Sequence, residues 1–573
     1  MSNDQPAVPG VAIPVRQVRP QSLAPDPRPL SACLVFLGCP KNQVDSEHVL
    51  GSLTEAGYNL TIDPRSADLV VITTCAFLQS AVRESEAAIR EALKLKQGNS
   101  KTRNGQHEPP MHTDSRADAC QEAISVHPCP SVVGRSSRYP AVIVAGCLVQ
   151  RYGKTLKRRF PAVDLWVPLS DMPRIAERLS PIAPRLHQSK IQDPKPRIRP
   201  CSPRVLSTPG HFAYLKIADG CDNRCSYCMI PDIRGPFRSR PMRDIIAEAR
   251  DLARAGVKEL ILVAQDTTLY GTDLPKGVHH KDTKTRISRL APATDIEATK
   301  ALLRRSTNLE VRIPIEARMG NDGFGDSGLN RHSGFGFRAC TSLSLWPSTS
   351  ESGLAELLDR LRRIDGVRWL RLMYTHPAHL TEDVIDQFAS NPKLCRYIDL
   401  PIQHVAGHLL DRMNRHYTRK DIEIQLESLR AIPDMHIRTT IITSLPGETT
   451  RDFDELLAFV RAARFDRLSC YAYSPEPGTK AARLRGQLSP AVKKERVRRL
   501  MLAQAAISRA NLKKLVGRKL TVLVDSPGIA RTRWDAPEID GVVKLTGRRV
   551  NSGDFVQALV TGFSTHDLTA RVI

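Results

Sequence analysis

The chain has 573 residues, of which 41% are hydrophobic and 25% charged, and its formal net charge is +24. Ordinary domain sizes predict two to four domains with ample core. No run of about 18 apolar residues occurs, which excludes a membrane-spanning helix. Residues 1–30 contain seven prolines and lack the apolar segment of a secretory signal, so we expect a disordered leader.

The charge and the cysteines bear on partners and location. A net charge of +24 would attract RNA or a ribosomal surface. The alternative is that the surface charge only keeps the protein soluble, which would account for the same net charge. The 13 cysteines are an odd count in a long chain, and several lie in short motifs. This pattern favours metal binding in a reducing, cytoplasmic setting over a disulfide framework. We also expect no membrane partner.

Three apolar runs in the N-terminal part each end in a cysteine. They cover residues 32–40, 67–76 and 139–148, and the cysteines are Cys39, Cys75 and Cys147. Strands of an open α/β sheet place their carboxyl ends at the edge where ligands bind. The three thiols are therefore predicted to converge on an iron–sulfur cluster, whereas a single cysteine after a strand is more often a small buried hydrophobe.

A helix is expected over residues 42–58, between the first two strands. Asp45 and Ser46 have side chains that favour a helix N-cap. Val49 and Leu53 then lie on one apolar face of this helix. The pattern is typical of an α/β domain in which that face packs on the sheet.

Two segments have the composition of flexible insertions. Residues 97–138 are rich in Ser, Asn, His, Pro and Gly, and residues 275–350 show no sustained periodicity. In the first segment, Cys120 and Cys129 flank His127. A metal site is one interpretation of these three residues, and incidental loop cysteines are the other.

Three cysteines at CxxxCxxC spacing form the most informative motif. Cys221, Cys225 and Cys228 suit three irons of a 4Fe–4S cube and leave the fourth iron open to another ligand. A zinc site is the alternative, but zinc needs a fourth ligand at short spacing. The next candidates, His279 and Cys340, lie far along the chain.

Helices and short strands alternate on either side of this motif. Such βα units predict a parallel sheet closed partly or wholly into a barrel, with active groups on the loops after the strands. A strand over residues 212–219 precedes the CxxxCxxC loop, and helix–strand pairs cover residues 245–267, 353–375 and 425–448. Four polar side chains at strand ends are candidates for cofactor or substrate contact, or for loop hydrogen bonding alone: Gln265, Asp266, His376 and His404.

The C-terminal part begins with a long basic helix over residues 490–516, which Gly517 is placed to end. Short alternating segments follow, in the pattern of a small β-barrel. They cover residues 519–526, 541–548, 554–562 and 567–573.

Seven stretches of the chain resemble the methylthiotransferases, a family of radical S-adenosylmethionine (SAM) enzymes, and within them the ribosomal protein uS12 branch. They are residues 37–48, 214–236, 263–274, 371–378, 399–405, 445–450 and 535–542. The first contains GCPKN, where tRNA-modifying relatives typically show GCQMN. The resemblance extends over most of residues 31–573, interrupted by the two insertions.

The resemblance implies an α/β architecture in three parts. An N-terminal α/β cluster domain covers residues 31–180, and a central radical-SAM (βα) partial barrel covers residues 207–500. A small OB-like β-barrel of the TRAM type covers residues 503–573, and the leader of residues 1–30 precedes them all.

The resemblance also implies a transferase that methylthiolates the β-carbon of an aspartate in uS12, free or on the ribosomal small subunit. Its implied cofactors are SAM, with two molecules used per product, and two 4Fe–4S clusters. Cys221, Cys225 and Cys228 are implied to hold the catalytic cluster that binds SAM, and Cys39, Cys75 and Cys147 the second cluster. The implied partners are a flavodoxin- or ferredoxin-type reductant and RNA at the TRAM domain.

Two other functions stay open. One is methylthiolation of a tRNA adenosine, which the basic charge permits and GCPKN disfavours. The other is a non-catalytic, cluster-bearing RNA-binding protein in which the insertions have ended catalysis. Two positions also depart from the family: Thr73 stands where Asn is usual, and Ser444 replaces a usual Gly where its side chain is expected to crowd SAM.

Overall fold

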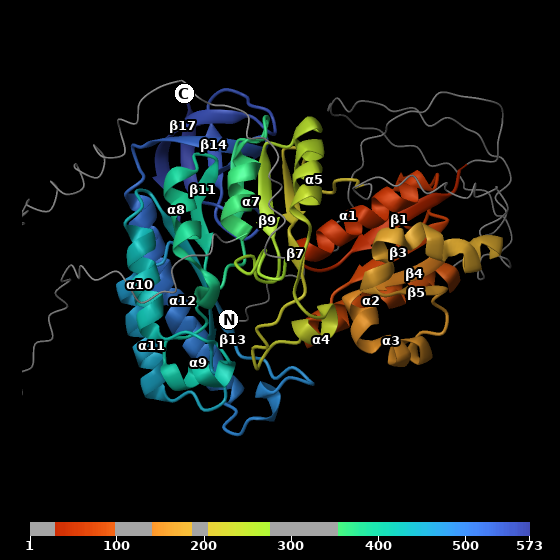
Figure 1. Ribbon diagram of the computed structural model, residues 1–573, viewed down its shortest axis with the longest axis horizontal. Coiled ribbons are helices and arrows are strands. Elements are labelled where there is room, and N and C mark those ends of the chain that lie inside the picture. The colour runs from red at the N-terminus through yellow and green to blue at the C-terminus, as the bar shows by residue number, and fades with distance from the viewer. Residues whose placement is uncertain (1–28, 98–139, 186–203, 275–352) are drawn as a thin grey trace, which may run out of the picture. The chain divides into compact units, whose positions relative to one another are not determined.

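The computed structural model describes residues 29–97, 140–185, 204–274 and 353–573, which Figure 1 draws in colour. Most of the predicted leader, nearly all of both predicted insertions, and the candidate site of Cys120, His127 and Cys129 lie outside these ranges. Among the helices within them, none is both long enough and apolar enough to cross a membrane.

The N-terminal part contains a five-stranded parallel sheet. Its strands are β1 (Ser31–Phe36), β2 (Asn59–Thr61), β3 (Leu69–Thr74), β4 (Ala141–Gly146) and β5 (Leu165–Val167), in the order β2-β1-β3-β4-β5. β3 and β4 are buried at every residue, as expected for parallel strands covered on both faces. Because β1, β3 and β4 are neighbours, their carboxyl ends share one edge. The helical segments of this part are α1 (Pro40–Glu55), α2 (Gln79–Gln97), α3 (Cys147–Arg159) and the 3-10 segment η2 (Leu169–Arg185).

The predicted cap of the first helix is wrong. Helix α1 begins at Pro40, with Cys39 as its N-cap residue, because the fixed φ of proline suits the first helical position. Asp45 and Ser46 lie inside the helix and are buried. The Asp45 carboxylate is paired with Arg234 instead, at 2.9 Å.

A six-stranded parallel sheet follows the N-terminal part. Its strands are β6 (Phe212–Lys216), β9 (Glu259–Val263), β10 (Trp369–Leu372), β11 (Leu394–Asp399), β12 (His436–Thr443) and β13 (Arg467–Ala472), paired in chain order. β6 and β13 are the edges, so the sheet is an open, partial barrel, as predicted. The sequence placed His404 at a strand end, whereas β11 ends at Asp399. It did not predict β13, because polar residues such as Ser469 interrupt the apolar pattern.

Helices and short strands complete this part (Figure 1). α5 packs against β6 and α7, α8 against β11, and α12 against β13 and α11. The helices are α4 (Ile230–Arg234), α5 (Met242–Arg254), α7 (Gly353–Arg362), α8 (Glu382–Ser390), α9 (Gly407–Met413), α10 (Arg419–Arg430), α11 (Thr450–Ala463) and α12 (Pro490–Lys513), and the short strands are β7 (Ala218–Asp219) and β8 (Arg238–Ser239).

The C-terminal strands close into a five-stranded barrel, as predicted. They are β14 (Lys519–Ser526), β15 (Ile529–Thr532), β16 (Val543–Thr546), β17 (Phe555–Phe563) and β18 (Leu568–Val572). Inward-facing residues such as Val522, Val524 and Ala558 form its core. The sequence missed β15 because this short strand buries a charged residue, Arg531, which is 2% exposed.

Candidate functional site

The CxxxCxxC loop begins directly after β7. Gly220 opens it with a φ of +74°, and a Cβ at this position would lie 2.0 Å from the carbonyl oxygen of Pro236. Only glycine fits such a close backbone approach. The loop then folds back on itself, with the Cys228 amide donating to the Cys225 carbonyl at 3.0 Å.

The three thiols of this loop lie near enough to affect one another's ionisation. Burial raises the pKa of Cys228 to about 12, and the charges of Cys225 and Cys221 act in the same direction. Burial also raises the pKa of Cys221 to about 11. In the metal-free protein Cys221 and Cys228 are therefore neutral thiols at pH 7, and iron would displace their protons on binding.

The structure brings Cys39, Cys75 and Cys147 together at the carboxyl edge of the N-terminal sheet. Cys39 follows β1 and caps α1, Cys75 follows β3 directly, and Cys147 follows β4 directly and opens α3. Burial raises the pKa of Cys147 to about 12, and the charges of Cys75 and Cys39 add to this rise. The donor set is again three soft thiolates, which suits iron and sulfide. That these residues hold a cluster stays a prediction.

Arg234 connects the two groups of cysteines. It ends α4, six residues after Cys228, and its side chain is 1% exposed. Its guanidinium donates to the Cys147 sulfur at 3.8 Å. Two carboxylates neutralise its charge, Asp45 at 2.9 Å and Asp219 at 2.8 Å. The sequence analysis missed Arg234, although a basic residue shortly after a cysteine motif is a detectable signal.

A second arginine lies beside the CxxxCxxC loop. Arg415 is 6% exposed and donates to the Cys225 sulfur at 3.5 Å. It follows α9, and 190 residues separate it from Cys225. The sequence analysis missed it, because no local pattern connects positions so far apart.

Buried polar atoms without hydrogen-bond partners gather at the carboxyl edge of the six-stranded sheet. In the described part of the chain, these include atoms of Gln265 after β9, His376 after β10, Gln403 and His404 after β11, and Ser444 after β12. An unsatisfied buried polar group costs about 1–3 kcal/mol, so such a concentration fits a polar ligand. The edge that holds the CxxxCxxC loop therefore fits SAM.

His376 and His404 are fixed in the same tautomer. The Nδ1 of each accepts the amide of the second residue after it, Ala378 at 3.1 Å and Ala406 at 3.0 Å. Burial lowers the pKa of His376 to about 2 and that of His404 to about 3, so both rings are neutral. Nε2 then carries the proton in each ring. The Nε2 of His376 is an unpartnered donor at the sheet edge, whereas that of His404 lies 3.6 Å from the Glu448 carboxylate.

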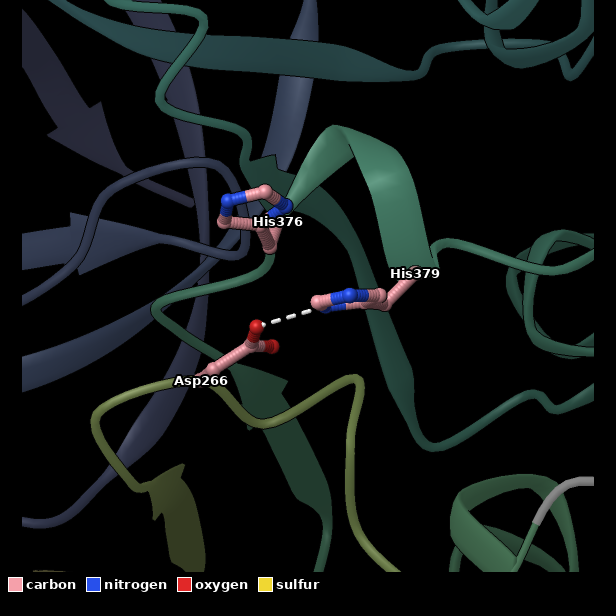
Figure 2. Close-up of side chains that lie close together, drawn as sticks. All are labelled: Asp266, His376 and His379. Carbon is pink, nitrogen blue, oxygen red and sulfur yellow. Dashed lines mark hydrogen bonds and ion pairs between the residues drawn. The ribbon is translucent and has the colours of Figure 1, made fainter. Parts of the chain in front are cut away.

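Asp266, His376 and His379 form a compact group after β9 and β10 (Figure 2). Asp266 accepts from His379 Nδ1 at 2.8 Å and from Asn223, in the CxxxCxxC loop, at 2.8 Å. Although burial opposes it, the hydrogen bond from His379 lowers the pKa of Asp266 to about 2. A divalent metal suits the residue types, but the free nitrogen of His376 carries a proton and cannot ligate. The group is therefore better suited to hydrogen bonding.

Backbone strain occurs at the same edge. Tyr374, Gln403 and Ser444 have positive φ angles of 60°, 61° and 66°, which cost roughly 1 kcal/mol or more for residues other than glycine. Such strain is common at ligand sites. Thr73, the other departure from the family, accepts a hydrogen bond from Ser46 at 2.9 Å, so threonine fits its position.

Three family models match the sequence. The radical SAM superfamily model matches residues 215–317, the TRAM domain model matches residues 516–573, and the model of uncharacterized protein family UPF0004 matches residues 31–103. A three-cysteine loop at the carboxyl edge of an open parallel sheet, together with the superfamily match, defines a radical SAM enzyme. Such an enzyme uses a 4Fe–4S cluster and SAM, and the predicted fold class is confirmed.

The relatives define the family more narrowly. The ribosomal protein uS12 methylthiotransferase RimO of Geobacter sulfurreducens is 35% identical over 549 residues, covering 94% of this chain and 98% of the relative. The protein of the same name from Akkermansia muciniphila is 34% identical and is covered completely, with 95% of this chain. The chain therefore belongs to the uS12 methylthiotransferase family of radical SAM transferases, which confirms the predicted resemblance and enzyme class.

Among solved structures, the chain resembles the radical SAM methyltransferase TsrM of Kitasatospora setae. The two are 13% identical with a TM-score of 0.41, over 88% of this chain and 77% of that chain. This likeness is too low to carry an argument about function.

Proposed function

We propose that the chain transfers a methylthio group to the β-carbon of one aspartate in small-subunit ribosomal protein uS12. The substrate is the one named for the relatives that are about a third identical over nearly the whole chain. The single observation that carries the chemistry is the presence of two cysteine groups with Arg234 between them. Arg234 lies six residues after Cys228 in the chain, and its guanidinium contacts Cys147.

Under this proposal each cysteine group holds one 4Fe–4S cluster. Cys221, Cys225 and Cys228 hold the cluster that binds SAM, and Cys39, Cys75 and Cys147 hold the second. When bound, these groups supply reductive cleavage of SAM, hydrogen abstraction from the substrate carbon and a methylated sulfur, with two SAM used per product. A flavodoxin- or ferredoxin-type protein supplies the electrons.

The chain's own residues bind and orient the reactants. The Nε2–H groups of His376 and His404 are fixed donors at the sheet edge, and Asp266 holds His379 and Asn223 in place. Because these groups are positioned before any ligand arrives, they need no reorganisation during the reaction.

The division into residues 31–180, 207–500 and 503–573 is part of the same proposal. The TRAM barrel at the C-terminal end is proposed to present uS12, free or on the small subunit, and to contact RNA. This assignment is supported by the match over residues 516–573.

Mass spectrometry of uS12 from cells lacking this gene, with and without the gene restored, tests the substrate. We expect one aspartate to gain a methylthio group only on restoration. If uS12 stays unmodified while tRNA adenosines gain the group, the substrate is a tRNA. If neither changes, the chain is not a methylthiotransferase in that cell.

Cysteine variants test the two roles. We expect Cys225→Ala to abolish release of 5′-deoxyadenosine from SAM, and Cys75→Ala to retain that release while losing methylthio transfer. Cys33→Ala is the matched control, since Cys33 is a buried cysteine of β1 outside both groups. Methylthio transfer by Cys75→Ala would contradict the two-cluster proposal.

A further inference from the structure

Arg415 is held rigidly beside the CxxxCxxC loop. Its Nε donates to the Tyr417 hydroxyl at 2.8 Å, and its Nη2 donates to the Pro401 carbonyl at 2.8 Å. Tyr417 is fixed in turn, because its hydroxyl donates to the Ile402 carbonyl at 2.8 Å. Two of the three guanidinium nitrogens are thus anchored, and the third, Nη1, donates to the Cys225 sulfur at 3.5 Å.

The charge of Arg415 has no carboxylate partner among the described residues. Its acceptors are a hydroxyl, a carbonyl and a thiol sulfur, and none of the ion pairs found in residues 204–274 and 353–573 includes it. Arg234, at the other cysteine group, differs because Asp45 and Asp219 neutralise it. A buried cation without a counter-ion costs several kcal/mol, so the Arg415 site is incomplete in the metal-free protein.

Anionic thiolates at Cys225 and its neighbours would complete this site. Reduction of a cluster held there adds one electron and one negative charge, and no bond forms or breaks. A fixed cation and a hydrogen bond to a ligating sulfur both stabilise the more negative state, and such contacts tune cluster potentials.

We propose that Arg415 raises the reduction potential of the cluster on Cys221, Cys225 and Cys228, and so favours delivery of an electron to this cluster. Arg415 is a positioning residue that acts through Cys225. The inference rests on the proposed assignment of a 4Fe–4S cluster to these cysteines.

The test is a potentiometric titration of the reconstituted full chain, with dithionite as reductant and the reduced cluster followed by electron paramagnetic resonance. Cys39, Cys75 and Cys147 are replaced by alanine in every sample, so that one cluster gives the signal. In this background, Arg415→Gln is expected to lower the equilibrium constant for one-electron reduction at least tenfold, which is about 59 mV.

Arg412→Gln is the matched control. Arg412 is exposed and lies three residues earlier in the chain, where it donates to the Pro446 carbonyl at 3.0 Å. Its loss removes the same charge from an exposed side chain whose hydrogen bond goes to a carbonyl, and the potential should stay nearly unchanged. Arg415→Lys keeps the charge, so its potential should lie closer to that of the unsubstituted background than to that of Arg415→Gln.

The neutral variants should fold, because they remove a charge that is unpaired in the metal-free protein. Arg415→Met repeats the measurement if Arg415→Gln does not hold iron. An Arg415→Gln or Arg415→Met protein with full iron content and an unchanged potential overturns the inference. Absence of iron from the background protein, with Arg415 intact, overturns the cluster assignment instead, so the two failures are distinguishable.

Discussion

Arg234 and Asp45 form a buried ion pair at 2.9 Å, although 189 residues separate them. Arg234 belongs to the segment that carries Cys228, and Asp45 lies in the helix that Cys39 caps. The same guanidinium donates to Cys147. The N-terminal cysteine group is therefore completed by a residue of the CxxxCxxC segment, so the two groups are built as one structure.

Replacement of Arg234 by Met should destabilise this connection. The change removes one of the two cations that Asp45 and Asp219 share, since Lys216 also pairs with both carboxylates, and breaking a buried pair costs at most about 3–5 kcal/mol. We expect the free energy of unfolding to fall by up to that amount, and reconstituted protein to hold one cluster in place of two. Denaturant titration and iron analysis measure both. Arg243→Met is the control, since the Arg243 side chain is 87% exposed; equal losses in the two variants would contradict the assigned role.

Glu259 holds a second buried network, which joins the six-stranded sheet to the C-terminal barrel. It lies between Arg371 at 2.7 Å and Arg531 at 2.8 Å, and all three side chains are at most 2% exposed. Although burial opposes it, the two arginines hold the pKa of Glu259 below its ordinary value. The carboxylate is therefore charged at neutral pH and compensates both cations.

Glu259→Gln should thus cost about 3–5 kcal/mol, because it leaves the buried guanidinium of Arg371 without a counter-ion, whereas Arg531 keeps Asp525 at 2.7 Å. Glu356→Gln is the matched control, since Glu356 forms a surface pair with Arg360 on α7, worth less than about 1 kcal/mol. Thermal and denaturant unfolding of the full chain compare the two. A Glu259→Gln protein as stable as the control would show that the network is dispensable.

Local patterns predicted the parts of this site that are continuous in sequence. The three apolar runs that end in Cys39, Cys75 and Cys147 predicted that these cysteines share one edge of the sheet, because parallel strands align their carboxyl ends. The partners of these residues were not predictable in the same way. Arg415 reaches Cys225 across 190 residues, and Asp45 turned inward because Arg234 is there, whereas a helix-capping rule considers only neighbours in sequence.

The fixed histidines predict a loss of stability in acid. The pKa values of His376 and His404 are lowered by burial to about 2 and about 3 in the folded protein, from 6.5. Below pH 6.5 the two histidines bind protons in the unfolded chain but not in the folded protein. Their contribution to stability is therefore fully present above that pH and is lost as the pH falls. Each histidine contributes about 1.4 kcal/mol for every pH unit below 6.5.

Denaturant titrations at pH 7.5 and 5.5 measure this slope. His376→Asn and His404→Asn keep an acceptor near the place of Nδ1 for the following amide, and they remove the titrating ring. Each variant should reduce the loss of stability between pH 7.5 and pH 5.5 by about 1.4 kcal/mol. An unchanged slope in both would mean that the folded rings take up protons like those of the unfolded chain.

Ser444 combines strain with an unpartnered group, and the two contributions can be separated. It is fully buried, has a φ of +66°, and its hydroxyl finds no partner within the described residues. Ser444→Ala removes only the hydroxyl and should stabilise the SAM-free protein by about 1 kcal/mol. Ser444→Gly also relieves the left-handed backbone, which should add roughly 0.5–1 kcal/mol after the greater chain entropy of unfolded glycine is offset.

The affinity for SAM tests whether the Ser444 hydroxyl contacts this cofactor. If strain and an unmet hydrogen bond are retained because the hydroxyl contacts SAM, both variants should bind SAM about fivefold more weakly, which corresponds to one ordinary hydrogen bond. Equilibrium dialysis against the reconstituted protein measures the affinity, and denaturant titration without SAM measures the stability. Tighter SAM binding by Ser444→Gly alone would show instead that the serine side chain crowds the cofactor, and equal affinity in all three proteins would place the hydroxyl out of reach of SAM.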